Sequence, residues 1–201
     1  MKIIQLFAIA LLVLLGNSSY AQSMNLASGN LDFLKGQKTI NLVYTYDNLR
    51  VGPGTEQEYI DKKVNGYNKD KPGHGDEWLK NWKNDRPTRY QPKFEELINK
   101  QLEKPGVKVG NFPNAPYTLI LRTTFIEPGF NVYMARRPAN TNLEAAFVKT
   151  GTTAELAVIT MMKSPGRDAL GYDFDSGERI SESYAKAGKS LANFLIKAKV
   201  M

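Results

Sequence analysis

The segment from residue 126 to residue 139, IEPGFNVYMARRPA, combines a carboxylate, a Pro-Gly pair and two arginines. Pro128-Gly129 has the residue types of the central positions of a type II turn, where proline fixes φ and glycine accepts a positive φ. We expect Arg136 and Arg137 in an irregular connection beyond this turn. Their guanidinium groups can pair with carboxylates such as Glu127, or they can bind an anionic ligand. Structural pairing is the favoured interpretation, and a ligand-binding loop is the alternative.

A second candidate site consists of aromatic side chains. Trp78 and Trp82 are four residues apart, so they share one face of a helix. Further aromatic residues lie nearby in sequence: Tyr59, Tyr67, Tyr90 and Phe94. Rings at this spacing usually pack a helix against its neighbours, which is the favoured interpretation. Alternatively, they form a platform for sugar rings or for a partner's apolar side chains.

Catalytic chemistry has few candidate groups in this chain. There is no cysteine and only one histidine, His74, which we expect to be exposed between two glycines. A multi-histidine zinc site and a Cys-His pair are therefore excluded, and a serine nucleophile would depend on His74. Two carboxylates suffice for glycoside cleavage, so the alternative function is a carboxylate-dependent glycan hydrolase using Glu127 with Asp173 or Asp175.

The segment DFDSGE, Asp173 to Glu178, resembles a calcium-binding loop but departs from its pattern. Glu178 occupies the sixth position, where glycine is needed, and Tyr184 occupies the twelfth, where a bidentate glutamate is needed. Asp175 and Glu178 instead have the spacing of a helix cap. We therefore expect no metal and no cofactor.

The charge and the first residues of the chain predict where the protein works. Residues 1–21 have a basic start, an apolar run and a small-residue cleavage motif, which together predict a secretory signal peptide. No comparable apolar run follows, and without cysteine there is no acceptor for a lipid anchor. The net charge of +7 is spread along the chain, which favours an anionic envelope surface over nucleic acid. We expect an exported protein, periplasmic or extracellular.

Hydrophobic periodicity predicts the fold class. Residues 22–38 are expected to form a flexible lead-in, and residues 39–201 a single domain. Alternation predicts strands over 39–46, 117–127, 143–149 and 152–162, the last two as a hairpin; in 117–127, Phe125 faces the core with Leu121. Helices are expected after a capping box at Thr55 and Glu58, from Asp76 to the break at Pro87, over 91–102, and from Ile180 onward, with Gly188 approaching the sheet. This order predicts an α+β domain: a mainly antiparallel sheet of about four strands with helices packed on one face.

Four segments together resemble a family of uncharacterised secreted bacterial proteins: FLKGQKTINLVYTYDNLRVG, the helix with Trp78, Trp82 and Arg86, YTLILRTTFIEPGFNV and SYAKAGKSLANFL. The chain is also distantly similar to the periplasmic α/β domains of curli-secretion and penicillin-binding-protein-activator lipoproteins. The resemblance implies a partner-binding role in the envelope, although the lipid-acceptor cysteine of those proteins is missing here.

The sequence thus favours an exported, soluble, non-enzymatic protein that acts as a binding or structural component of the cell envelope. Its partner would be an envelope protein or an anionic envelope polymer, bound through the less covered face of the sheet or the 126–139 loop. The tentative binding residues are Glu127, Arg136, Arg137, Trp78 and Trp82. The sequence leaves the oligomeric state open.

Overall fold

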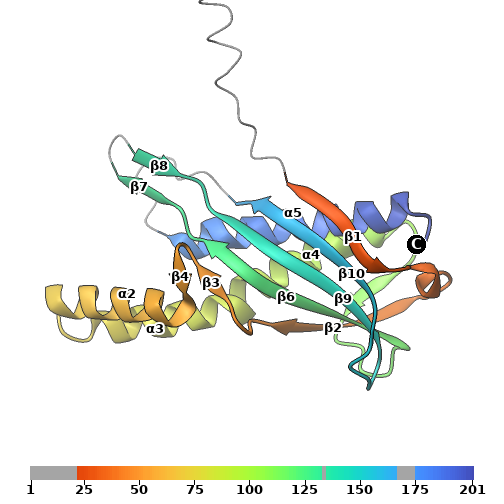
Figure 1. The fold of residues 1–201 in the computed structure, drawn as a ribbon, viewed down its shortest axis with the longest axis horizontal. Helices are drawn as coiled ribbons and strands as arrows, with labels where there is room; N and C mark the ends of the chain where they lie inside the picture. The colour runs from red at the N-terminus through yellow and green to blue at the C-terminus, as the bar shows by residue number, and fades with distance from the viewer. Residues whose placement is uncertain (1–21, 133–134, 167–174) are drawn as a thin grey trace, which may run out of the picture.

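The computed structural model describes residues 22–132, 135–166 and 175–201, which form an α+β fold (Figure 1). The strands are β1 Ser23–Gly29, β2 Thr39–Thr45, β3 Arg50–Val51, β4 Gly54–Thr55, β5 Lys108–Gly110, β6 Tyr117–Glu127, β7 Phe130–Val132, β8 Ala135–Arg137, β9 Asn140–Lys149 and β10 Glu155–Pro165. The helices are η1 Asp32–Leu34, α2 Glu56–Asp70, α3 His74–Asp85, η2 Arg86–Tyr90, α4 Gln91–Leu102 and α5 Ser176–Lys197.

The main sheet has eight strands and is mixed, so the expectation of about four mainly antiparallel strands was too simple. Its order is β1-β10-β9-β6-β2-β5, with β3 paired to β6 and β4 paired to β3. The β9–β10 hairpin is antiparallel, as expected, but β2 is parallel to both β5 and β6. The reason is the connection: three helices between β2 and β6 return the chain to the end of the sheet where β2 began, which makes the next strand parallel.

Residues 22–38 are not an irregular lead-in. Ser23–Gly29 forms β1, which pairs antiparallel with β10 at one edge of the sheet. Leu31 and Leu34 are buried, so this segment also contributes to the core. The sequence did not predict this strand because its residues are mostly polar and show no clear alternation. An edge strand can form without that pattern, since backbone hydrogen bonds to one neighbouring strand hold it in place.

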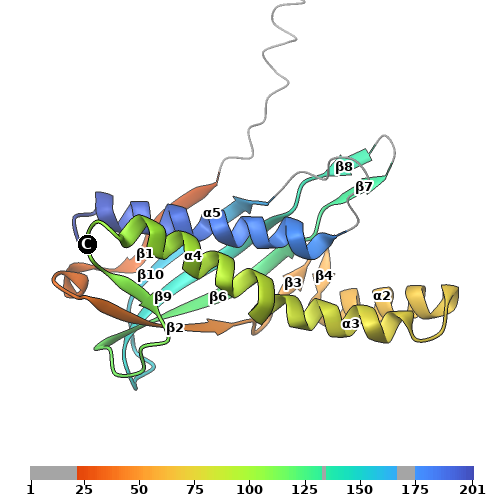
Figure 2. The same cartoon turned by 180° about the vertical axis from the view of Figure 1, so that it is seen from behind.

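Helices α4 and α5 lie side by side on one face of the sheet, as expected (Figure 2). The apolar stripe of α5 is buried, and two of its polar side chains bond to the strands below. Tyr184 forms a 2.6 Å hydrogen bond with Thr123 of β6, and Ser183 lies 3.1 Å from the hydroxyl of Thr141 of β9. Gly188 faces α4 and not the sheet: a Cβ there would lie 2.5 Å from the carbonyl oxygen of Phe94.

A β-bulge in β6 changes which side chains face the helices. Opposite β9, Thr123 pairs with Leu143 but Phe125 pairs with Asn142, so one residue is skipped. The expected alternation is therefore wrong beyond Thr123, and Ile126 takes the buried position. The bulge sets the orientation of the last residues of β6, just before the turn that carries part of the candidate site.

Helices α2 and α3 form an antiparallel hairpin that extends beyond the end of the sheet (Figure 1). The capping box of Thr55 and Glu58 at the start of α2 is confirmed. Helix α3 begins at His74, two residues earlier than expected, and ends at Asp85, just before the expected break at Pro87. The chain does not leave the helical path there. It continues through the π-helical turn η2 into α4, because the wider turn accommodates the proline ring.

Candidate functional site

Two adjoining hollows lie between the α2–α3 hairpin and the turn that joins β6 to β7. The first has a volume of about 750 Å³ and the second about 690 Å³. Six residues line both: Tyr59, Lys63, Tyr67, Pro128, Gly129 and Phe130. We call this pair of hollows the hairpin groove, and sites of this size commonly hold small molecules or segments of a polymer.

Aromatic rings form the wall of the groove on the hairpin side. Trp78 and Trp82 stack with ring centroids 5.7 Å apart, and Tyr59 lies against both. Trp82 is only 3% exposed, and its Nε1 donates a 2.7 Å hydrogen bond to Glu56, which also accepts from Arg86. Trp82 therefore supports the wall, as packing predicts. Trp78 is only partly buried, and it lines the second hollow beside the exposed Tyr67.

The face of α2 toward the groove carries Tyr59, Lys63 and Tyr67, which recur every four residues. The Nζ atom of Lys63 lies 5.8 Å and 5.5 Å from the centroids of these two tyrosine rings, a cation–π geometry. Burial raises the pKa of Tyr59 well above its ordinary value, with smaller contributions from Tyr67 and Glu127. Tyr59 is therefore a neutral hydrogen-bonding group at neutral pH.

The opposite wall is the turn between β6 and β7. Glu127 accepts a 3.0 Å hydrogen bond from Arg137 and a 3.2 Å bond from the backbone N–H of Gly129. Gly129 has φ +71°, as the turn prediction requires, and a Cβ there would lie 2.6 Å from the carbonyl oxygen of Arg137. The guanidinium of Arg137 lies 5.6 Å from the ring centroid of Phe130, which is 39% exposed in the groove.

The expected irregular connection around Arg136 and Arg137 is instead a strand. β8 pairs antiparallel with β7 in a separate two-stranded sheet, where Arg137 lies opposite Phe130 and Arg136 opposite Asn131. The ion pair between Glu127 and Arg137 joins the end of β6 to β8. The side chain of Arg136 lies outside the described part of the structure.

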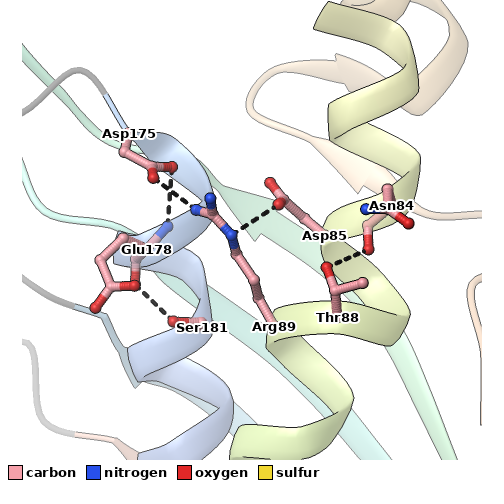
Figure 3. Close-up of polar contacts among 7 residues, drawn as sticks. All are labelled: Asn84, Asp85, Thr88, Arg89, Asp175, Glu178 and Ser181. Carbon is pink, nitrogen blue, oxygen red and sulfur yellow. Dashed lines mark hydrogen bonds and ion pairs between the residues drawn. The ribbon is translucent and has the colours of Figure 1, made fainter.

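Three charged residues of the second hollow, Asp85, Arg89 and Asp175, form an ion cluster. Figure 3 shows its polar contacts. Arg89 is 3.1 Å from Asp85 and 2.6 Å from Asp175, so it joins the end of α3 to the start of α5. Burial raises the pKa of Asp85. Burial also opposes ionisation of Asp175, but the bonds from Arg89 and from the backbone N–H of Glu178 outweigh it and lower the pKa of Asp175.

Asp175 caps α5 by accepting a 3.2 Å hydrogen bond from the N–H of Glu178, as the sequence predicted. Asp173 lies outside the described residues. Among the described residues, no group of three or more His, Cys, Asp or Glu side chains could hold a metal ion. His74 is exposed, as expected, although it begins α3 and does not lie in a loop.

Four of the five sequence-predicted site residues therefore meet at the hairpin groove. Glu127 and Arg137 line the first hollow, and Trp78 and Trp82 line the second. Sequence reasoning missed Lys63 and Phe130, which line both hollows. The four-residue spacing of Tyr59, Lys63 and Tyr67 is a signal that could have identified Lys63. Nothing local identifies Phe130, because its importance comes from the distant hairpin opposite.

The less covered face of the sheet, the other expected binding surface, carries paired charges. Arg122 of β6 donates a 2.6 Å bond to Glu155 of β10 and lies 3.9 Å from Glu144 of β9. Val43 is exposed on the same face. No helix among the described residues is long and apolar enough to cross a membrane.

No protein-family model and no curated protein matches the chain. Among solved structures, a PelC dodecamer from Paraburkholderia phytofirmans is similar with a TM-score of 0.42 and 12% identity, over 89% of this chain and 97% of that one. A single-residue variant of that dodecamer gives a TM-score of 0.35 and 12% identity, over 83% and 96%. At this level the likeness assigns no family or function, and the resemblance to curli-secretion and activator lipoproteins stays a prediction.

Proposed function

We propose that the protein is a non-enzymatic binding component of the cell envelope and that the hairpin groove is its ligand site. The observation that carries the proposal is the exposure of aromatic rings on two facing walls: Tyr67 is 37% exposed on the hairpin and Phe130 39% exposed on the turn. Exposed rings gathered in a concave site are typical of ligand recognition, whereas isolated exposed apolar residues are not.

The carboxylates at the groove support binding more than hydrolysis. Glu127 lines the first hollow and Asp175 the second, and each is bonded to an arginine. A hydrolase needs one protonated and one ionised carboxyl group on either side of a scissile bond. The bonds from Arg89 and from the backbone N–H of Glu178 lower the pKa of Asp175, so Asp175 stays ionised and does not supply the general acid. Export rests on the signal-peptide pattern of residues 1–21.

The test is retention of envelope material by the immobilised protein. The purified wild type and a Trp78→Ala/Phe130→Ala variant are incubated with an envelope extract, and retained protein and polysaccharide are both quantified. Loss of one ring contact costs roughly 1–2 kcal/mol, so the double variant should retain at least about tenfold less.

Val43→Ala is the control, because Val43 is exposed on the less covered face of the sheet and lies away from the groove. It should retain as much as the wild type. If the Trp78→Ala/Phe130→Ala variant stays folded and still retains as much as the wild type, the groove is not the site. A selective loss with Val43→Ala would assign binding to the sheet face.

A further inference from the structure

The chemistry of the groove, taken as the site of the proposed function, also indicates which ligand it holds. We infer that the hairpin groove binds an acidic glycan chain, with Lys63 contacting a carboxylate of the glycan and the aromatic rings contacting its sugar faces.

The first step is the pairing of the cations at the groove. Arg137 is paired with Glu127, and Arg89 is paired with Asp85 and Asp175. Lys63 is partly buried, lines both hollows and forms no ion pair with any residue that the structure describes. Such a lysine at the middle of a site favours an anionic group of the ligand, because a charge-assisted hydrogen bond is stronger where water is partly excluded.

The rings around Lys63 hold this cation in place. Its ammonium lies near the faces of Tyr59 and Tyr67, so it cannot turn fully into solvent without losing the cation–π contacts. Arg179 lies beneath the same hollow, where it is 4% exposed and donates to the carbonyl oxygens of Pro128 and Gly129. Lys63 is therefore held at the centre of the groove, between the two tyrosine rings and the turn.

The second step is the pattern of polar and aromatic groups. Asn81 and Asn84 line the second hollow, are exposed, and their side-chain amides bond to no other described residue. Each amide offers donors and an acceptor, which suits the paired hydroxyl groups of a sugar ring. The exposed rings of Tyr67 and Phe130 offer flat apolar faces to the C–H groups of that ring.

These features favour a glycan over a peptide. An amphipathic helix would need a continuous apolar groove, but Lys63, Asn81 and Asn84 interrupt the aromatic wall. Two adjoining hollows suit a chain of several sugar units, one following the other.

The experiment compares an acidic oligosaccharide with its neutral methyl ester, which has the same sugar chain. Binding of hexagalacturonate and of its fully methyl-esterified, neutral form is measured by isothermal titration calorimetry with the purified protein at low salt. The acidic form should bind about tenfold or more tightly than the ester. Lys63→Gln should reduce this preference to about twofold, and raised salt should weaken binding of the acid only.

Lys69→Gln is the matched control, because Lys69 is an exposed lysine of the same helix that does not line the groove. It should keep the preference for the acid. Equal binding of both ligands, or an acid preference that survives Lys63→Gln, would overturn the inference and leave the proposed function standing. If neither ligand binds but the wild type still retains more envelope material than the Trp78→Ala/Phe130→Ala variant, the acidic-glycan inference is overturned and the proposed function stands. If the two proteins also retain equal amounts of envelope material, the inference and the proposed function are both overturned.

Discussion

The crossing of α4 and α5 gives a sharp test of how the helix layer is built. Gly188 of α5 faces the backbone of α4, and a Cβ there would lie 2.5 Å from the carbonyl oxygen of Phe94 and 3.2 Å from the nitrogen of Ile98. Ordinary carbon contacts need about 3.5–4 Å. Because the obstacle is backbone and not the end of a flexible side chain, Gly188→Ala must push the two helices apart by about 1 Å.

The cost follows from opposing effects. Replacing glycine by alanine inside a helix contributes about 1 kcal/mol of stability. Overpacking a tight core costs about 1–3 kcal/mol, and a rigid shift of α4 also loosens the burial of Phe94 and Ile98, both fully buried. We expect a net loss of about 1–2 kcal/mol. For a chain of this length that lowers the melting temperature by about 2–8 °C.

The same substitution at Gly66 is the control. Gly66 lies within α2, and nothing approaches within 4 Å of a Cβ built there. Gly66→Ala should therefore stabilise the protein by up to about 1 kcal/mol. Urea unfolding and thermal melting of both variants measure the difference. If Gly188→Ala is as stable as the wild type, the close contact between α4 and α5 is wrong.

Three further predictions concern named contacts. Tyr184→Phe removes a 2.6 Å hydrogen bond and leaves the buried Thr123 hydroxyl without it, so the free energy of unfolding should fall by about 1–2 kcal/mol; an unchanged urea midpoint would contradict this. Thr55→Ala removes the capping box of α2 and should cost about 1 kcal/mol, seen as lower helicity in circular dichroism melts. The pKa of Asp175 is lowered in the folded state, so its ionised form stabilises the fold at pH values above the ordinary aspartate pKa. Above the ordinary aspartate pKa, the wild type should exceed Asp175→Asn in free energy of unfolding by a constant amount. This difference should disappear as the pH falls through the lowered pKa, and urea unfolding at a series of pH values measures it.

The elements that could be predicted from sequence are those with a strong local pattern. The strand over Tyr117–Glu127 and the helix over Gln91–Leu102 match their expected ranges, because alternation and helical spacing are continuous in both. The start of α2 was also predictable, since a capping box is encoded within four residues. In each case the information that specifies the element lies inside the element.

The elements and contacts that the sequence did not predict depend on residues that are distant in sequence. β1 is a strand because β10 supplies its hydrogen bonds, and Gly188 faces α4 because of how two helices cross. The pairing of β2 with β6 is parallel because helices connect the two strands, and a helical crossover returns the chain to the end of the sheet where β2 begins. The groove shows the same limit, because its two walls come from residues more than forty positions apart. Trp78, Trp82, Glu127 and Arg137 were predicted as binding residues, and Tyr59 and Tyr67 were named only as nearby aromatic residues.

The position of the aromatic groups separates stability from recognition. The main core lies between the sheet and the α4–α5 layer, whereas the α2–α3 hairpin extends beyond it and packs mainly on itself (Figure 2). Trp82 is buried and bonded, so its role in holding the hairpin together accounts for it. The same explanation does not account for Phe130, whose ring stays 39% exposed in the groove. An exposed ring that forms one wall of a concave site is best explained by what enters that site. Phe130→Ala should therefore weaken ligand retention in a protein that remains folded, and retention equal to that of the wild type would contradict this role.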